Sequence, residues 1–380
     1  MSERITLALA GDVMTGRGID QILPHACPPH LYEPAASSAL DYVALAEAAH
    51  GPIPRRVEPG YVWGAAAAAL ARVRPAAFVV NLETSLTTSE DALPKGINYR
   101  MHPANVGVLG AVGIGCCVLA NNHVLDWGEV GLLETLATLA RAGIPAAGAG
   151  RTLADAERPA VLAPAGTAAE AATRVLVLAC GTGDSGIPPA WAAGPARPGV
   201  HRLPDLTPAT VVHLGRLVAA AKRPGDVVVA SVHWGGNWGW TVPRAQVAFA
   251  HALIDEAGVD VVHGHSSHHP KAIEVHHEHP ILYGCGDFLD DYEGIEGAEA
   301  YRCDLALLYF VTLAVPGGRL LELTMTPLRL RRFRLEPAPA ADRAWLARTL
   351  RRECGRFGRS VLERDDGDFA LSARPPAGAR

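Results

Sequence analysis

Side chains suited to metal binding and proton transfer gather at five places along the chain. In chain order they are Asp12, Asn81 with Glu83, Asn122 with His123, His233, and the run from His263 to His269. Carboxylate and amide oxygens bind hard divalent cations, and imidazole nitrogens bind Zn, Mn, Fe or Ni. One polar cluster at a strand end is ordinary, because such residues usually have hydrogen-bonding roles. Five such clusters together predict one site.

Each cluster lies at the end of a short, β-branched run that is typical of a strand buried on both faces. The predicted strands are 5–11, 78–82, 116–120, 175–180, 227–232 and 259–262, and the predicted helices between them are 129–142, 207–221 and 243–257. This alternation predicts a layered α/β fold. Ligands of open α/β sheets bind at the carboxyl ends of the strands, which is where all five clusters fall. Residues 181–186 are glycine-rich without a phosphate-loop or dinucleotide pattern, and we expect them to shape the pocket.

The pattern changes in the last third of the chain. Residues 272–275, 281–283, 305–315 and 320–330 read as strands joined by tight turns, which predicts an antiparallel sheet beside the earlier one. A helix is expected over 341–353, followed by a frayed tail from Ser372. The proline-rich residues 24–59 are expected to form a long loop or lid. No linker divides the chain, so we expect one compact domain over 1–335, with 336–380 packing on it as a C-terminal helix and flexible tail.

Composition excludes several classes of protein. A net charge of −5 and a pI near 6.3 argue against nucleic-acid binding. No run of about 20 apolar residues occurs, so no membrane span is expected. The seven cysteines form no C-x-x-C pair, and residues 5–10 are too short for a signal-peptide core. We therefore expect free thiols and a cytoplasmic location, and we make no prediction of oligomeric state.

A pair of divalent cations explains the clusters physically. Two metals about 3.5–4 Å apart need a bridging carboxylate and separate ligands on each flank. Asp12 or Glu83 could bridge, and the surrounding ligands would be Asn122, His233, His265 and His268. The spacing of His265 and His268 lets two imidazoles reach neighbouring cations from one turn. The sequence leaves the metal open among Mn, Zn, Fe, Ca and Mg, and leaves open whether it is required.

The motifs also resemble a known family. They read GDVMTGR at 11–17, NLET at 81–84, ANNHVLDWG at 120–128, HWG at 233–235 and GHSSH at 264–268. Their types and order resemble the CapA family, which is known for poly-γ-glutamate capsule synthesis. The resemblance extends from about Ile5 to about Asp291. It implies a metallophosphatase-like α/β fold: a four-layer sandwich of two mixed β-sheets flanked by helices.

The resemblance also implies roles for individual residues. Asp12 and Glu83 match the family's acidic metal ligands, and Asn122 its amide ligand. His233, His265 and His268 match the later histidine ligands. His123 matches the acid/base, with Asp126 orienting its ring. Asp12 and His268 are also candidates for proton transfer.

Two departures from the family pattern stand out. Capsule-type members usually carry an N-terminal membrane anchor, which is not expected here. Asp287 occupies a position where many members have Asn, which adds a carboxylate near the site.

Other residues allow both a functional and a structural interpretation. Trp234, Trp238 and Trp240 could form an aromatic wall for a substrate or could simply pack. Arg17 and Arg100 could bind a carboxylate or phosphate through two hydrogen bonds, and Arg17 is the better candidate because it closely follows Asp12. We expect His276, His277 and His279 to be exposed at a hairpin turn.

Several functions remain compatible with the sequence. The first is a hydrolase-like metalloenzyme acting on a peptide or polyglutamate-type (γ-glutamyl) substrate. The second is a peptide epimerase that inverts an α-carbon in the biosynthesis of ribosomal lasso peptides, by Asp/His acid–base catalysis. A non-catalytic accessory protein of polyglutamate synthesis and a phosphoesterase are further alternatives.

Overall fold

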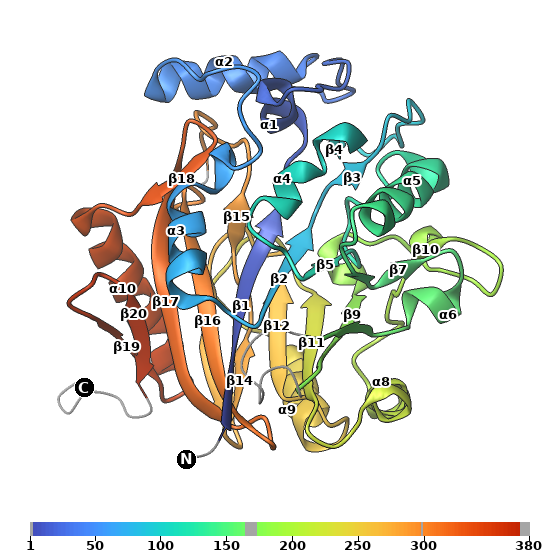
Figure 1. Ribbon diagram of the computed structural model, residues 1–380, viewed down its shortest axis with the longest axis vertical. Helices are drawn as coiled ribbons and strands as arrows, with labels where there is room; N and C mark the ends of the chain where they lie inside the picture. Colours follow the sequence, from blue (N-terminus) through green and yellow to red (C-terminus); the bar gives the residue numbers. More distant parts are fainter. Residues whose placement is uncertain (1–2, 164–172, 298, 373–380) are drawn as a thin grey trace.

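Two large sheets dominate the computed structural model, which describes residues 3–163, 173–297 and 299–372 (Figure 1). The first sheet has the order β19-β20-β17-β16-β1-β2-β5-β6, with β15 beside β1 and β18 beside β17. Its strands are β1 (Glu3–Val13), β2 (Ala77–Leu82), β5 (Cys116–Val118), β6 (Ala146–Ala147), β15 (Asp287–Leu289), β16 (Leu305–Val315), β17 (Leu320–Arg331), β18 (Arg334–Pro337), β19 (Ser360–Glu363) and β20 (Phe369–Ser372). β1, β2, β5 and β6 are parallel, so the first predicted strands of the chain lie together.

The second sheet has the order β13-β14-β12-β11-β9-β8. Its strands are β8 (Ala160–Leu162), β9 (Val175–Gly181), β11 (Val227–His233), β12 (Val261–His265), β13 (Ile273–His276) and β14 (His279–Leu282). β9, β11, β12 and β14 are parallel. Two short pairs complete the described strands: β3 (Ser85–Leu86) with β4 (Arg100–Met101), and β7 (Ala149–Gly150) with β10 (Gly199–Val200).

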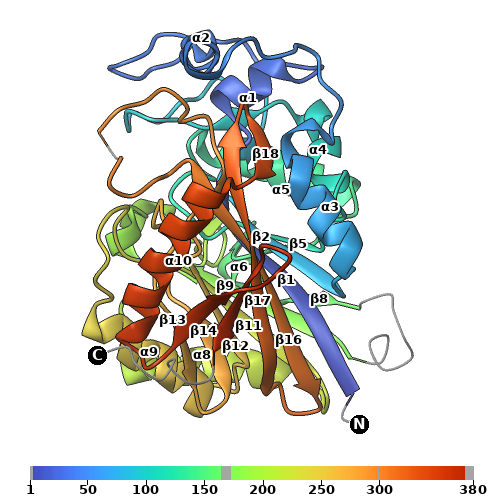
Figure 2. The same cartoon turned by 90° about the vertical axis from the view of Figure 1, so that its left-hand side faces the viewer.

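The two sheets pack face to face, and helices cover their other faces (Figures 1 and 2). Leu9 of β1 and Val229 of β11 belong to the same apolar cluster, which lies between the sheets. Val228 points to the opposite face, against α8 (Pro208–Ala221) and α9 (Arg244–Asp255). Successive strand residues face opposite sides, so a strand covered on both faces is apolar throughout. The first sheet is covered on its outer face by α3 (Gly64–Val73) and α5 (Gly128–Arg141).

The predicted loop over 24–59 is wrong in its second half, where α2 (Ala39–His50) lies. Ser38 Oγ accepts a hydrogen bond from Leu40 N at 3.2 Å, and the Asp41 carboxylate accepts one from Ser38 N at 3.2 Å. This reciprocal cap satisfies amide groups at the helix start. Val43 and Ala46 are buried, but Leu40 and Leu45 are exposed, so the apolar residues of the helix do not form the single stripe that predicts a helix.

The antiparallel pairing predicted for the last third of the chain is confirmed, but these strands do not form a sheet of their own. β16 pairs antiparallel with β1, and β17 with β16, so both extend the first sheet. β13 and β14 instead extend the second sheet. A strand can pair with whichever sheet edge is open, and sequence periodicity alone does not say which.

The C-terminal segment packs on the first sheet and on the core between the sheets. α10 (Ala340–Gly355) contributes Leu346 and Leu350 to the apolar cluster between the sheets. β19 and β20 follow, and β20 pairs with β17 at Thr324 and Met325. Only a helix and a tail were predicted here, so β19 and β20 are additional elements. Most of the predicted tail, 373–380, lies outside the described residues.

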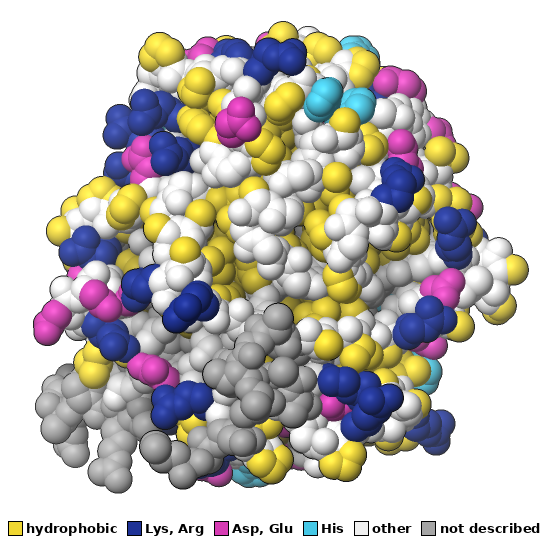
Figure 3. Space-filling model, in the orientation of Figure 1, with side chains coloured by type: hydrophobic (Ala, Val, Ile, Leu, Met, Phe, Trp, Pro, Cys, Tyr) yellow, Lys and Arg dark blue, Asp and Glu magenta, His cyan; other side chains and the backbone are white. Residues whose placement is uncertain are grey.

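The remaining helices are short. They are α1 (Arg17–Ile22), α4 (Gly107–Gly110) and α6 (Leu153–Ala156), with 3₁₀ turns at Tyr61–Trp63, Pro103–Asn105, Gly183–Ser185 and Pro189–Trp191. Within the described ranges, no helix is long and apolar enough to cross a membrane. Figure 3 shows Lys and Arg side chains scattered over one face among acidic and apolar ones.

Candidate metal centre

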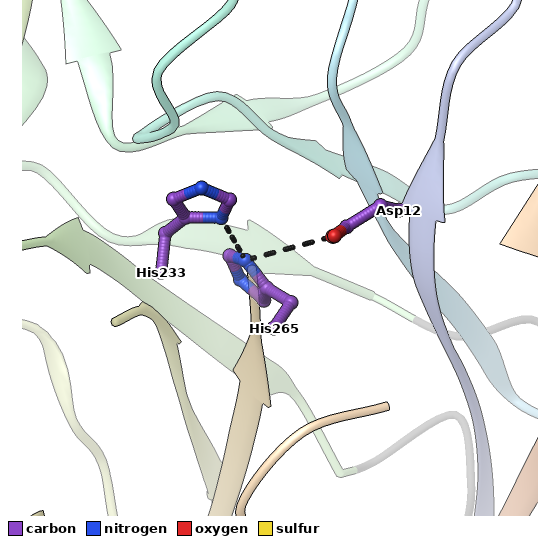
Figure 4. Close-up of side chains that lie close together, drawn as sticks. All are labelled: Asp12, His233 and His265. Atoms are coloured by element: carbon purple, nitrogen blue, oxygen red, sulfur yellow. Dashed lines mark hydrogen bonds and ion pairs between the residues drawn. The ribbon is translucent and has the colours of Figure 1, made fainter. Parts of the chain in front are cut away.

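Four parallel strands bring the candidate site together at one edge of the facing sheets. Asp12 of β1 lies in register with Asn81 of β2, and His233 of β11 lies in register with His265 of β12. The carboxyl ends of these strands therefore meet, as expected for an α/β ligand site. In Figure 4, His233 and His265 lie beside each other and His265 is directed to the Asp12 carboxylate.

Asp12, His233 and His265 form a first group of potential metal ligands. One candidate ligand atom from each residue lies within 4.8 Å of the others. His265 Nδ1 is 2.8 Å from His233 Nδ1 and 4.0 Å from Asp12 Oδ1. All three side chains are buried. One carboxylate oxygen and two imidazole nitrogens suit Zn, Mn or Fe.

A hydrogen-bonded chain beneath His265 determines which of its ring nitrogens is free. His263 Nε2 lies 2.9 Å from the Ala10 carbonyl oxygen, so Nε2 carries the proton. Burial lowers the pKa of His263 to about 4, so the ring is neutral and its Nδ1 accepts from Ser231 Oγ at 3.0 Å. Ser231 Oγ in turn accepts from His265 Nε2 at 2.9 Å. His265 therefore presents an unprotonated Nδ1 to His233 and Asp12, as a metal ligand requires.

A second ligand group shares Asp12 with the first. It consists of Asp12, His268 and Asp287, again with candidate ligand atoms within 4.8 Å of one another. His268 Nδ1 is 2.8 Å from Asp287 Oδ1. Asp287 Oδ2 is buried without a hydrogen-bond partner among the described residues, which is costly for a carboxylate oxygen. Because Asp12 belongs to both groups, it is placed to bridge two neighbouring cations.

Glu83 and Asn122 lie against these groups. Asn81 Nδ2 donates to Asp12 Oδ1 at 2.7 Å and to Glu83 Oε2 at 2.9 Å. Asn122 Oδ1 is 3.1 Å from His233 Nε2. Gly186 has a φ of +88°, and a Cβ there would lie 3.1 Å from Asn122 Nδ2, so the glycine-rich loop closely approaches this amide. All six predicted metal ligands therefore belong to one connected set.

His123 stands beside this set with one ring nitrogen fixed. Its Nδ1 is 2.7 Å from Asp126 Oδ2, which also accepts from Tyr99 N at 2.7 Å. Lys95 Nζ donates to Asp126 Oδ1 at 2.7 Å. Asp126 accepts three hydrogen bonds, so the His123 proton lies on Nδ1 and the unprotonated Nε2 is 3.8 Å from Glu83 Oε1. Burial is the main cause that lowers the pKa of His123, to about 4, so this ring is neutral at pH 7.

Two carboxylates of the centre, Asp12 and Glu83, have raised pKa values. Burial, together with the charge of Asp287, raises the pKa of Asp12 to about 7. Burial and the charges of Asp12 and Asp287 raise the pKa of Glu83 well above its usual value. Each acid therefore opposes the ionisation of its neighbours.

The buried histidines of the second sheet shift in the opposite direction. Burial lowers the pKa values of His233 and His265 well below 6.5. His268 differs: burial alone would lower its pKa, but the charge and hydrogen bond of Asp287 raise it above 6.5. The centre thus contains neutral imidazoles and one imidazole that favours the charged form.

These residues fit a divalent metal. Three buried carboxylates repel one another, one of their oxygens has no partner, and neutral imidazoles turn lone pairs toward them. A cation would stabilise the ionised acids and use the free nitrogens at the same time. The residues that could hold it are Asp12, Glu83, Asn122, His233, His265, His268 and, in addition, Asp287.

The three predicted substrate-binding residues lie in different surroundings. Arg17 is buried, and its guanidinium pairs with Asp291 and with Glu33, so its charge is used within the protein. Trp234 lies in the apolar cluster of the second sheet and donates to the Tyr283 carbonyl at 3.0 Å. Trp238 is 44% exposed, with its ring 5.1 Å from that of His268, at the rim of the centre.

An aromatic group continues from Trp238 along this rim. Tyr301 has its ring 5.2 Å from Trp238 and 5.4 Å from Trp240, and Trp240 lies 4.2 Å from His269. Arg100, the other predicted anion-binding arginine, stacks on Trp127 and pairs with Glu90 at 3.0 Å. An aromatic surface therefore borders the centre on the His268 side.

Lys95 and Ser231 were not among the predicted site residues, and no role was predicted for His263. Ser231 and His263 had a usable signal, because they stand two residues before His233 and His265 and so face the same side of their strands. Lys95 had none. It lies in a loop, and only the fold brings it to Asp126.

Comparisons with known proteins identify the family of the chain. A family model described as "Bacterial capsule synthesis protein PGA_cap" matches residues 6–292. A "Probable polyglutamine synthesis accessory protein" of Mycobacterium tuberculosis is 46% identical over 364 residues, covering 95% of this chain and 94% of the relative. "PGA biosynthesis protein CapA" of Bacillus subtilis is 26% identical over 277 residues, covering 73% of this chain and 66% of the relative. This chain therefore belongs to the PGA_cap (CapA) family of bacterial capsule synthesis proteins.

Proposed function

We propose that this chain is a metallophosphatase-fold, metal-dependent enzyme that acts on a γ-glutamyl or peptide amide bond during synthesis of a polyglutamate-type polymer. The names of the two relatives support the biological context. The facing sheets, with helices over their outer faces, support the fold. The single observation that carries the chemistry is that Asp12 belongs to two adjoining ligand groups beside a neutral, oriented His123.

Seven side chains of the centre would hold the divalent cations. They are Asp12, Glu83, Asn122, His233, His265, His268 and Asp287. When bound, divalent cations supply polarisation of a carbonyl oxygen and a lower pKa for water. Their positive charge would also offset the three buried carboxylates, which otherwise repel an anionic glutamyl chain.

His123 moves the proton in this proposal. Its neutral ring has an unprotonated Nε2, so it first accepts a proton from the attacking nucleophile and then donates it to the leaving amine. Asp126 stabilises the positive ring between the two steps, and Lys95 holds Asp126 in place.

The rim suggests how the substrate is oriented. The exposed Trp238 and the half-buried Tyr301 offer an aromatic surface beside His268, which suits methylene groups of a glutamyl chain. Lys95, whose side chain is 25% exposed, lies on the His123 side, with Nζ 3.4 Å from His123 Nδ1, and offers positive charge for a carboxylate. We propose that the substrate spans these two sides.

The test is cleavage or transfer of a synthetic γ-linked glutamate oligomer by the purified chain, with an α-linked oligomer for comparison. We expect turnover with added Mn²⁺ or Zn²⁺, its loss after chelation, and a decrease of about 10²–10⁴-fold for His123→Gln. His30→Gln, which changes an exposed histidine, is the matched control. Undiminished turnover by chelated protein would exclude the metal-dependent mechanism.

One observation keeps inversion of an α-carbon as a second candidate. The centre contains an unprotonated imidazole, His123, and an imidazole favouring the charged form, His268, which is the pairing that proton removal and return require. Incubating glutamyl peptides in deuterated water separates the two reactions. Deuterium at a Cα without bond cleavage supports inversion, and cleavage without deuterium supports the first proposal.

A purely accessory role, as the name of the mycobacterial relative suggests for that protein, makes a third prediction. Polymer synthesis in cells would then be unchanged by combined Asp12→Asn and His123→Gln substitutions. We expect the opposite, because a buried centre with several perturbed ionisable groups is typical of catalysis.

A further inference from the structure

A second histidine cluster lies on the surface between α9 and the β13–β14 hairpin. His251 and Asp255 lie four residues apart on α9 and so share one helix face. Glu274 and His276 lie two residues apart on β13 and so share one strand face, and His277 follows in the turn. α9 leads into the start of β12, whereas His265 ends that strand. The cluster is therefore at the other end of β12 from the metal centre.

The side chains of this cluster are closely packed. The rings of His251 and His276 are stacked, with centroids 3.8 Å apart and planes 7° apart, and His277 lies 4.0 Å from His276. Two overlapping groups, His251 with Glu274 and His276, and Asp255 with His276 and His277, each have candidate ligand atoms within 4.8 Å. Three imidazoles and two carboxylates therefore offer candidate ligand atoms within a small area of the surface.

A carboxylate orients each imidazole. His251 Nε2 is 3.0 Å from Glu274 Oε1, His276 Nε2 is 3.0 Å from both Asp255 oxygens, and His277 Nδ1 is 2.8 Å from Asp255 Oδ1. A carboxylate accepts these protons, so each neutral ring keeps one free nitrogen: Nδ1 of His251, Nδ1 of His276 and Nε2 of His277. A carboxylate behind each imidazole is the usual arrangement around metal-binding histidines.

The turn that carries His277 is strained. His277 and Glu278 have φ values of +44° and +69°, where two-residue hairpin loops favour Asn-Gly. Non-glycine residues are disfavoured in this left-handed region of backbone conformation. The backbone conformation nevertheless directs His277 to Asp255. The cost is consistent with a function for this imidazole.

We propose that this cluster is a second, surface site for a borderline transition metal such as Zn²⁺, Ni²⁺ or Cu²⁺. His251 and His276 supply the central nitrogens, and His277 a third. Glu274 and Asp255 orient the rings or bind directly. Imidazole and carboxylate donors favour these ions over Mg²⁺ or Ca²⁺. The bound ion links α9 to β13, which stands at one end of the second sheet.

The test is titration of the full, chelator-treated chain without a histidine tag, using Cu²⁺ followed by electron paramagnetic resonance and Zn²⁺ followed by calorimetry. We expect one Cu²⁺ with several nitrogen ligands to be retained in Asp12→Asn, which separates this site from the proposed catalytic centre. His276→Gln should weaken that binding by more than about tenfold, and Asp255→Asn by about tenfold, while His30→Gln has no effect.

Thermal unfolding without metal verifies that each variant is folded. Zn²⁺ should raise the melting temperature of Asp12→Asn but not that of Asp12→Asn combined with His276→Gln, because only a protein that binds the ion is stabilised by it. Identical Cu²⁺ spectra and affinities for the wild type and His276→Gln would overturn the proposal. So would loss of this Cu²⁺ signal in Asp12→Asn.

Discussion

The two sheets contribute different chemistry to the centre. The carboxylate edge, Asp12, Glu83 and Asp287, belongs to the first sheet and its connections, and the imidazole edge, His233, His263 and His265, belongs to the second. Burial raises the pKa of Asp12 to about 7 but lowers that of His263 to about 4. Both shifts favour neutral groups. The two edges meet at β1 and β12, where they bring Asp12, His233 and His265 together as candidate metal ligands.

The largest effect is expected on proton transfer. We propose that His123 carries it out, and not the candidate metal ligands of either edge. His123→Gln should lower the turnover of a γ-linked glutamate oligomer by about 10²–10⁴-fold while leaving metal content unchanged. Turnover and elemental analysis on the same samples measure both. If metal is lost in parallel with activity, His123 belongs to the ligand set and the division is wrong.

The two edges should respond oppositely to pH in chelator-treated protein. The pKa of Asp12 rises from 3.8 to about 7 on folding, so folding takes up a proton between these values and stability falls as pH rises. The pKa of His263 falls from 6.5 to about 4, so folding releases a proton and stability rises with pH. Asp12→Asn should therefore make the slope of unfolding free energy against pH more positive, and His263→Gln less positive, each by up to about 1.4 kcal/mol per pH unit.

Urea unfolding at about pH 4.5, 5.5 and 6.5 measures these slopes. Changes of the same sign in both variants would contradict the opposite roles of the two edges.

A smaller effect should follow from Ser231, which touches no proposed cation but fixes the His265 tautomer. Ser231→Ala should weaken metal binding by about 10–100-fold, as for other residues that orient metal-binding histidines. Calorimetric titration with Zn²⁺ or Mn²⁺ in a His276→Gln background measures this centre alone. Ser231→Thr keeps the hydroxyl and is the matched control; equal affinities for Ala and Thr variants would show that the hydrogen-bonded chain has no such role.

The smallest effect is expected at Lys95, which acts on His123 through Asp126. Lys95→Met should reduce turnover by up to about tenfold, as one charge-assisted hydrogen bond is lost. The charge of Lys95 contributes to lowering the pKa of His123, so its removal should shift the acid limb of the pH–rate profile to higher pH. Lys95→Arg should restore the profile. An unshifted pH–rate profile for Lys95→Met would show that Lys95 does not influence proton transfer by His123.

The sequence predicted the parts of the site that follow from strand periodicity. Apolar runs ending in polar residues located Asp12, Asn81, His233 and His265, because parallel strands of stacked sheets bring their carboxyl ends to one edge. It did not locate Lys95, because a loop residue reaches its partner only through tertiary structure. Likewise, the pairing of β16 with β1 depends on which sheet edge is open. The apolar residues of helix α2 lie on both its exposed and its buried sides, so they give no helical periodicity.

Burial explains why Arg17 and Trp234 do not lie where the sequence predicted them, beside a substrate. Arg17 closely follows Asp12, but the fold provides it with Asp291 and Glu33 as partners. Trp234 follows His233 directly and so points to the opposite face of β11, into the helix-covered core. Arg17 and Trp234 are therefore close to metal-ligand candidates in sequence, but their side chains do not face the candidate metal centre.

The most direct test is the number of metal ions held by Asp12. Elemental analysis of metal-loaded chain, in the His276→Gln background that removes the surface cluster, should find two divalent ions per chain. Asp12→Asn in the same background should reduce this to fewer than one, because both ligand groups lose their shared carboxylate. Two ions retained in Asp12→Asn, or none bound before the substitution, would contradict the account.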